Sequence, residues 1–299
     1  MEHVRLIERP DLRSPILVAA FAGWNDAASC ATTAVRLLIE QWHARKFADI
    51  DPEEFYDFSV NRPRVRLDEQ LNRRLDWPAN DFYFHRGTDR SQDFVLFVGQ
   101  EPSLRWRTFT SGISQLAQDI GVKHVVLAGA LIADVIHTLP VNLSGSSNDP
   151  DMRERMGKLN ITFSRYEGPT GIVGAMLDRC VQDGLKAISV WAAVPHYIPT
   201  TPNPKIVASL LRHLRDILNF DFELSELDAA ARSFEEQVND AVSSNEQLRD
   251  YIAERERKER SETAPSEPAR IDDFPSGETV VRSLEEFLRQ NRLRPPEEH

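Results

Sequence analysis

Polar side chains that could bind a ligand or transfer a proton follow apolar stretches at several points of this sequence. Asn25 and Asp26 come after the apolar run 15–21 and a Gly23–Trp24 turn. Side chains at such a position could bind a ligand or polarise a water molecule, because ligands of open α/β sheets lie where strands end. The same two residues could instead cap the following helix by accepting hydrogen bonds from its first N–H groups.

A second group of candidates surrounds two histidines. His137 lies three residues after Asp134, and His196 with Tyr197 follows Pro195. An aspartate that orients a histidine is suited to general base catalysis. Residues three apart do not share a face of an extended strand, so a direct pair requires the chain to turn between Asp134 and His137.

The sequence lacks the signatures of several catalytic and cofactor sites. Ser144, Ser146 and Ser147 lie near His137, but the Gly-x-Ser-x-Gly elbow of serine hydrolases is missing. His137 and His196 have no third ligand at a spacing typical of metal sites. No Gly-x-Gly-x-x-Gly or P-loop pattern is present. We therefore assign no catalytic residue and expect no metal and no cofactor.

Continuous apolar runs predict buried strands of an α/β fold. Segments with helical periodicity separate these runs, which predicts right-handed crossovers and a mostly parallel sheet covered by helices. The strands are predicted at 15–21, 93–99, 123–130 and 187–194, and the helices between them start at 27, 105 and 172.

The polar residues that follow these strands should meet at the carboxyl edge of the sheet and line a pocket there. The predicted pocket residues are Gly23, Trp24, Asn25, Asp26, Glu101, Asp134, His137, Asn142, Thr170, His196 and Tyr197.

The remaining segments complete the predicted organisation. Further strands are expected at 54–60, 81–85 and 159–164, and loops at 61–80, which includes an extended portion, and at 142–150. Amphipathic helices at 205–219 and 225–242 should pair as a hairpin. We expect an α/β domain over 1–222 and a helical extension over 223–299, with a flexible linker near 261–276 and a short helix around Leu284.

Composition narrows the function classes. A net charge of -11 and a pI near 5.3 argue against a nucleic-acid-binding surface. Cys30 and Cys180 lie on apolar helical faces and are expected to be structural thiols of a reducing cytoplasm. The sequence has neither a secretion signal pattern nor the ~20 apolar residues that a membrane-spanning helix needs.

Four sequence blocks resemble one known family. Residues 133–141 resemble its A-D-x-x-H-T-x-P stretch, and the other blocks are 21–28, 166–172, and 189–197 with Asn203-Pro204. Over roughly residues 14–215 the chain resembles the PAC2 family, named for the eukaryotic proteasome assembly chaperone 2 and including many bacterial proteins of unassigned activity.

The resemblance implies a self-associating scaffold, a trimer by preference, that binds other protein subunits. Chaperone members dock on proteasome rings through a C-terminal hydrophobic-Tyr-any tail, whereas the given sequence ends Pro296-Glu297-Glu298-His299. Docking by that route is therefore not expected.

The alternative is a small-ligand-binding protein or an enzyme, because bacterial relatives are similar in fold to nucleoside phosphorylases and related hydrolases. An enzyme should gather Asn25, Asp26, His137, Asn142 and His196 around one cavity. A scaffold should leave these residues scattered or capped. We favour the non-enzymatic, assembly-chaperone-like scaffold.

Overall fold

A nine-stranded mixed sheet forms the centre of the molecule, in the order β1-β3-β6-β7-β2-β8-β11-β9-β10. The computed structural model describes residues 3–87, 92–198 and 202–261. The strands of this sheet are β1 (Val4–Leu6), β2 (Ile16–Ala22), β3 (Arg45–Ile50), β6 (Asp81–His85), β7 (Phe94–Gln100), β8 (His124–Ala133), β9 (Leu143–Ser147), β10 (Thr162–Phe163) and β11 (Lys186–Pro195).

The four strands at the middle of the sheet are parallel. β2 pairs with β7 and β8, and β8 pairs with β11, all in parallel register. β1, β3 and β6 on one side and β9 on the other are joined to this core by antiparallel pairing. The predicted α/β fold with a helix-covered sheet is confirmed.

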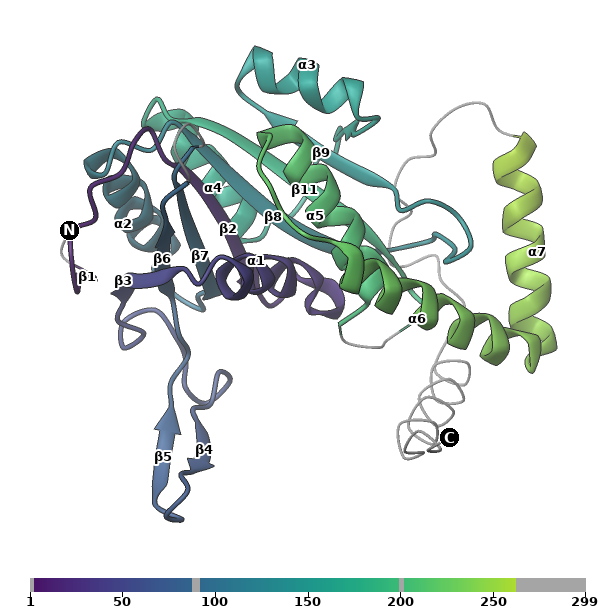
Figure 1. The fold of residues 1–299 in the computed structure, drawn as a ribbon, viewed down its shortest axis with the longest axis horizontal. Helices are drawn as coiled ribbons and strands as arrows, with labels where there is room; N and C mark the ends of the chain where they lie inside the picture. Colours follow the sequence, from purple (N-terminus) through teal and green to yellow (C-terminus); the bar gives the residue numbers. More distant parts are fainter. Residues whose placement is uncertain (1–2, 88–91, 199–201, 262–299) are drawn as a thin grey trace.

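Helices cover both faces of the sheet (Figure 1). They are α1 (Cys30–Gln41), α2 (Trp106–Asp119), α3 (Pro150–Lys158), α4 (Ile172–Gln182), α5 (Pro204–Leu218), α6 (Ser225–Ser243) and α7 (Glu246–Ser261), with a short 3-10 helix η1 (Ala27–Ser29) before α1.

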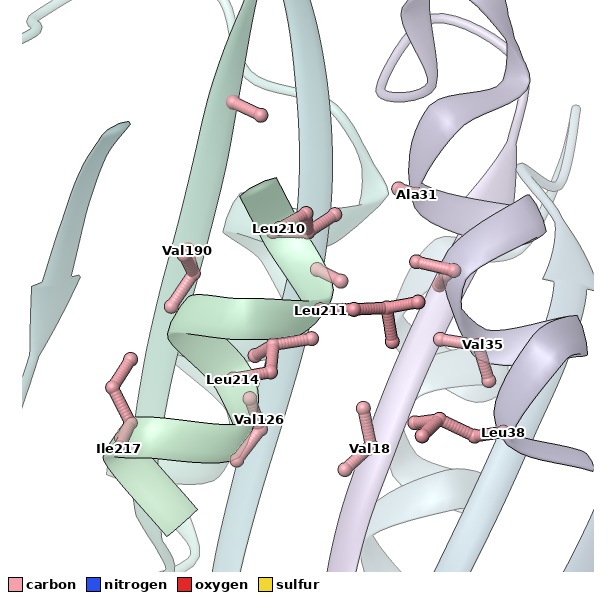
Figure 2. Packing of buried hydrophobic residues seen from close by; sticks show 14 of the residues in the cluster. Val18, Ala31, Val35, Leu38, Val126, Val190, Leu210, Leu211, Leu214 and Ile217 are labelled. Atoms are coloured by element: carbon pink, nitrogen blue, oxygen red, sulfur yellow. The ribbon is translucent and has the colours of Figure 1, made fainter. Parts of the chain in front are cut away.

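Alternate residues of β2 serve two separate cores. Ile16, Val18 and Ala20 pack with α1, α3 and α5 on one face, whereas Leu17 and Ala19 pack with α2 and α4 on the other. Figure 2 shows the first core, where α1 and α5 lie side by side over β2, β8 and β11. A strand that is apolar on both faces therefore ties the two helical layers together.

A third, smaller core holds the last two described helices. Ile136, Tyr197 and Ile198 pack against Val238 of α6 and Ile252 of α7. The predicted linker near 261–276 begins where α7 ends, and its remainder, with the helix predicted around Leu284, lies outside the described residues.

A hairpin of β4 (Arg64–Leu67) and β5 (Arg73–Asp76) forms a separate two-stranded sheet that projects from the body (Figure 1). β3 ends, and β6 begins, at the edge of the sheet where β7 ends. The hairpin therefore leaves the molecule from the carboxyl edge of the parallel strands. It provides the extended portion that we predicted within 61–80.

Several segments differ from the sequence prediction. Residues 54–60 form turns instead of a strand, because Asp57 binds the N–H groups of Ser59 and Val60. Residues 142–150 contain β9 instead of a loop, and 45–50 form a strand that the prediction missed. The strand expected at 159–164 is reduced to 162–163.

No helix in the described ranges is long and apolar enough to cross a membrane.

Candidate functional site

The carboxyl edge of β2 and β7 is the place where the fold favours a site. The chain leaves β2 toward α1 on one face of the sheet and leaves β7 toward α2 on the other. Ligands of open α/β proteins lie where adjacent parallel strands send their loops to opposite faces. Asn25 and Glu101 follow these two strands directly.

Asn25, Glu101 and Ile172 form what we call the rim cluster. Asn25 Nδ2 donates to Glu101 Oε1 at 2.7 Å, and the Ile172 N–H at the start of α4 donates to the same oxygen at 2.8 Å. Asn25 and Ile172 are fully buried. The Glu101 carboxylate, which directly follows β7, thus caps the start of α4, where the helix dipole favours a negative charge.

Two glycines allow this close packing. Gly23 has φ +122°, a conformation that L side chains rarely adopt, and a Cβ on Gly171 would overlap the Asn25 amide. Asn25 Oδ1 is buried and has no hydrogen-bond partner in the part of the chain that the structure describes.

Asp26 is the cap of α1. Its Oδ1 accepts hydrogen bonds from the N–H groups of Ala31 at 2.7 Å and Thr32 at 3.2 Å. Burial raises the pKa of its carboxyl. Ala28 and Ser29 both have positive φ in the turn that brings Asp26 over the helix start. Of the two roles that the sequence allowed for Asp26, ligand binding and helix capping, these contacts correspond to helix capping.

His137 and Tyr197 form the centre of a second group. Tyr197 Oη accepts from the His137 N–H at 2.8 Å and lies 2.7 Å from His137 Nδ1. His137 Nε2 lies 3.0 Å from Asn239 Oδ1 on α6. These contacts suit a neutral imidazole with its proton on Nε2, so that Tyr197 donates to Nδ1. Burial lowers the pKa of His137, in agreement with the neutral form.

The same group ties the 133–141 stretch to α7. Asp134 accepts a hydrogen bond from the Tyr251 hydroxyl, and Arg255 donates to the Asp134 carbonyl at 2.7 Å. Thr138 donates to Glu256 at 2.7 Å. We call this set the latch cluster; its members are Asp134, His137, Thr138, His196, Tyr197, Lys205, Glu235, Asn239, Tyr251, Arg255 and Glu256.

Lys205 and His196 complete the latch cluster. Lys205 donates to the His137 carbonyl and pairs with Glu235 at 3.0 Å. The His196 ring packs edge-on against Tyr197 and Tyr251, with centroids 5.4 and 5.6 Å apart. Burial lowers the pKa of His196 as well.

The predicted pocket residues therefore fall into two groups. His137 and Asn142 line a cavity of about 20 Å³, which is the size of one water molecule. Asn25, Asp26 and Glu101 are not among the residues that line it. Asn142 also borders an open groove of about 440 Å³ beside α5.

The other predicted pocket residues lie on the surface. Trp24 is 60% exposed, and Gly23 and Thr170 are exposed beside the rim cluster. Trp24 is therefore open to solvent, and it does not line the cavity or the groove described above.

The sequence reasoning missed the partners that α5, α6 and α7 supply. Asn239, Tyr251 and Glu256 lie more than 100 residues away from the groups they bind. Nothing in the local pattern of these amphipathic helices marks the residues that contact the 133–141 stretch.

The expected Asp134–His137 pair does not form in the part of the chain that the structure describes. His137 is bonded to Tyr197 and Asn239, and its expected partner Asp134 is bonded to Tyr251 and Arg255. Across the described ranges, no group of three His, Cys, Asp or Glu residues could hold a metal ion.

Comparison with known proteins places these features in a family. A sequence model of the PAC2 family matches residues 20–242. The chain is similar to the crystal structure of a PAC2 family protein from Streptomyces avermitilis, with 41% identity and a TM-score of 0.73 over 80% of this chain and 99% of that one.

A proteasome-assembly chaperone homologue from Mycobacterium tuberculosis has 39% identity and a TM-score of 0.72, over 79% of this chain and 99% of its own. The Pyrococcus furiosus proteasome activator PbaB, with 20% identity and a TM-score of 0.62, covers 80% of this chain and 99% of its own and shares the fold. No curated protein matches the chain.

Proposed function

The chain belongs to the PAC2 family, and from this premise we propose that it is a non-enzymatic, assembly-chaperone-like protein that binds other protein subunits at the carboxyl edge of its sheet. The 39% identity to a proteasome-assembly chaperone homologue supports this role and makes proteasome core subunits the first client proteins to test. We further propose that the chain acts as a homo-oligomer, as the resemblance implies.

The observation that carries the proposal is the contrast between bonded polar groups and exposed apolar groups at this edge. The polar side chains of the rim and latch clusters bind one another and the neighbouring helices. Large apolar side chains near the strand ends face solvent instead: Trp24 at 60%, Leu104 at 53% and Ile132 at 55%. Exposed Trp and aliphatic groups of this kind are typical of protein-binding surfaces.

Trp24 has the properties of an anchor residue. It follows the central strand β2, and the positive φ of Gly23 and the buried Asn25 fix the backbone on both sides. A large side chain on a rigid turn loses little conformational entropy when a partner covers it.

The test measures binding of the purified chain to proteasome core subunits from the same organism, by size-exclusion chromatography and titration calorimetry. We expect Trp24→Ala to weaken binding about thirtyfold, a loss of about 2 kcal/mol that is typical of an interface anchor. Val181→Ala is the matched control, because Val181 is 52% exposed near the opposite edge of the sheet.

Lack of binding by the wild-type chain would refute the proposed clients. Equal binding by Trp24→Ala and wild type would refute the proposal that clients bind at the surface around Trp24.

One observation favours a second candidate function, that of a small-ligand-binding protein. Asn25 Oδ1 is an acceptor without a described partner, close to the point where β2 and β7 send their loops to opposite faces. Native mass spectrometry of the purified chain would detect a retained small molecule, and Asn25→Ala should abolish its retention.

A further inference from the structure

The hairpin that projects from the carboxyl edge, residues 61–77, is here called the arm. Its base is held by Asn61, which donates to Ser103 Oγ at 2.9 Å and accepts from Gln100 at the end of β7. At its tip, Asp68 accepts hydrogen bonds from the N–H groups of Gln70 and Asn72, which closes the turn. The arm thus has a defined base and a defined tip.

The arm has one mostly apolar face and one charged face. The register places Val65 opposite Leu75 and Leu67 opposite Arg73 on one side, and places Arg64 opposite Asp76 on the other side. The apolar face is uncovered: Val65 is 49%, Leu67 59% and Leu75 54% exposed.

An isolated two-stranded hairpin in water is at best marginally stable. The ion pairs within the arm, Arg66 with Asp76 and Arg74 with Asp68, are on exposed side chains and contribute at most about 1 kcal/mol each. An apolar face that stays in water adds nothing to this stability. A surface that covers Val65, Leu67 and Leu75 would stabilise the arm.

The distribution of charge along the chain indicates which surface covers the apolar side chains of the arm. The arm carries five arginines and three acidic residues, a net charge of +2, which leaves -13 for the rest of a chain whose total is -11. Helix α6 is the acidic counterpart, with five acidic residues and one arginine, and its Glu226, Glu236 and Asp240 are exposed. A basic arm and an acidic body on the same chain complement each other between copies.

We propose that the arm docks on the acidic surface of a second copy of this chain, with its mostly apolar face buried in the contact and Arg73, on the same face, directed at the acidic side chains. The inference rests on the self-association included in the proposed function and names the element responsible for it. In a closed ring each copy would donate one arm and receive one.

The experiment determines the mass of the full chain by light scattering coupled to size-exclusion chromatography, without any client protein. The test variant is Val65→Ser with Leu75→Ser. The control variant is Ile7→Ser with Val181→Ser, two aliphatic residues that are 58% and 52% exposed outside the arm. Circular dichroism and the urea midpoint of each variant check that the body remains folded.

We expect the wild type and the control to have a multiple of the 34.1 kDa chain mass, and the arm variant to dissociate at least tenfold more readily. Because the contact joins opposite charges, dissociation of the wild type should also increase between 0.05 and 0.5 M salt.

A monomeric wild type would overturn self-association, and an arm variant with unchanged mass would overturn the role of the arm. If the arm variant keeps its mass but loses client binding, the arm binds clients and the inference is wrong. Client binding without self-association leaves the proposed client role intact, so the two failures can be distinguished.

Discussion

Removal of the Glu101 carboxylate tests whether the rim cluster is held together as described. One oxygen of Glu101 accepts hydrogen bonds from Asn25 Nδ2 and from the Ile172 N–H, at 2.7 and 2.8 Å. In Glu101→Ala both donors lose their acceptor. Asn25 and Ile172 are both 0% exposed, so water does not reach either donor in the folded wild type.

The expected cost follows from these two donors. A buried donor left without a partner costs about 1–3 kcal/mol, and water entering the space vacated by the side chain recovers part of it. We therefore expect Glu101→Ala to lower the free energy of unfolding by about 2–4 kcal/mol. Glu101→Gln keeps an acceptor oxygen and loses only the charge near the start of α4, so its cost should be about 1 kcal/mol.

Urea unfolding followed by circular dichroism measures both changes, with Glu69→Ala on the exposed tip of the arm as the control. Thermal scans should show a fall in Tm of roughly 5–15 °C for Glu101→Ala. If Glu101→Ala is as stable as wild type, or if Glu101→Gln loses as much as Glu101→Ala, the two hydrogen bonds do not stabilise this edge.

Other variants probe the latch cluster, the core and the thiols. Burial lowers the pKa of His137 in the folded chain, so below the ordinary histidine pKa of about 6.5 the unfolded chain binds more protons than the folded chain. The urea midpoint should therefore fall as the pH drops from 7 to 5. It should fall less steeply in His137→Gln. Leu211→Ala, which empties a fully buried position between α1 and α5 (Figure 2), should cost about 2–5 kcal/mol in urea unfolding, whereas Leu104→Ala at an exposed position should cost less than 0.5 kcal/mol. Burial raises the pKa of Cys30 and of Cys180 to about 12, so a thiol reagent at pH 8 should label neither until the chain unfolds; rapid labelling of the native chain would contradict their burial.

The central strands were predictable because each is buried on both faces. The run 15–21 has no polar residue to place in water, and the structure uses its alternate residues in two cores. Continuous apolar character is a local property, so the sequence displays it directly.

The strand β9 was not predictable for the opposite reason. Its residues 143–147 are mostly Ser and Gly, a composition typical of loops. The structure brings this segment so close to β11 that a Cβ on Gly145 would overlap the Ser189 carbonyl, and Ser146 Oγ lies 3.1 Å from Ser189 Oγ. Small residues favour this pairing only because β11 is already in place.

For the candidate site, the sequence identified residues that follow the strand ends but not their partners. Asn25 and Glu101 each follow an apolar run, and parallel strands bring them together as expected. A direct Asp134–His137 pair requires the chain to turn between the two residues. Instead, Tyr251 and Asn239 bind them from helices far along the chain.

The sequence by itself determined the α/β class, the central strands and the family, because apolar runs, helical spacing and the 133–141 motif are properties of neighbouring residues. Only the tertiary structure decided which polar groups are bonded and which apolar groups stay in water. Asp134 and Tyr251 are 117 residues apart. Their contact depends on how α6 and α7 pack against the segments that follow β8 and β11, and no local pattern encodes that path.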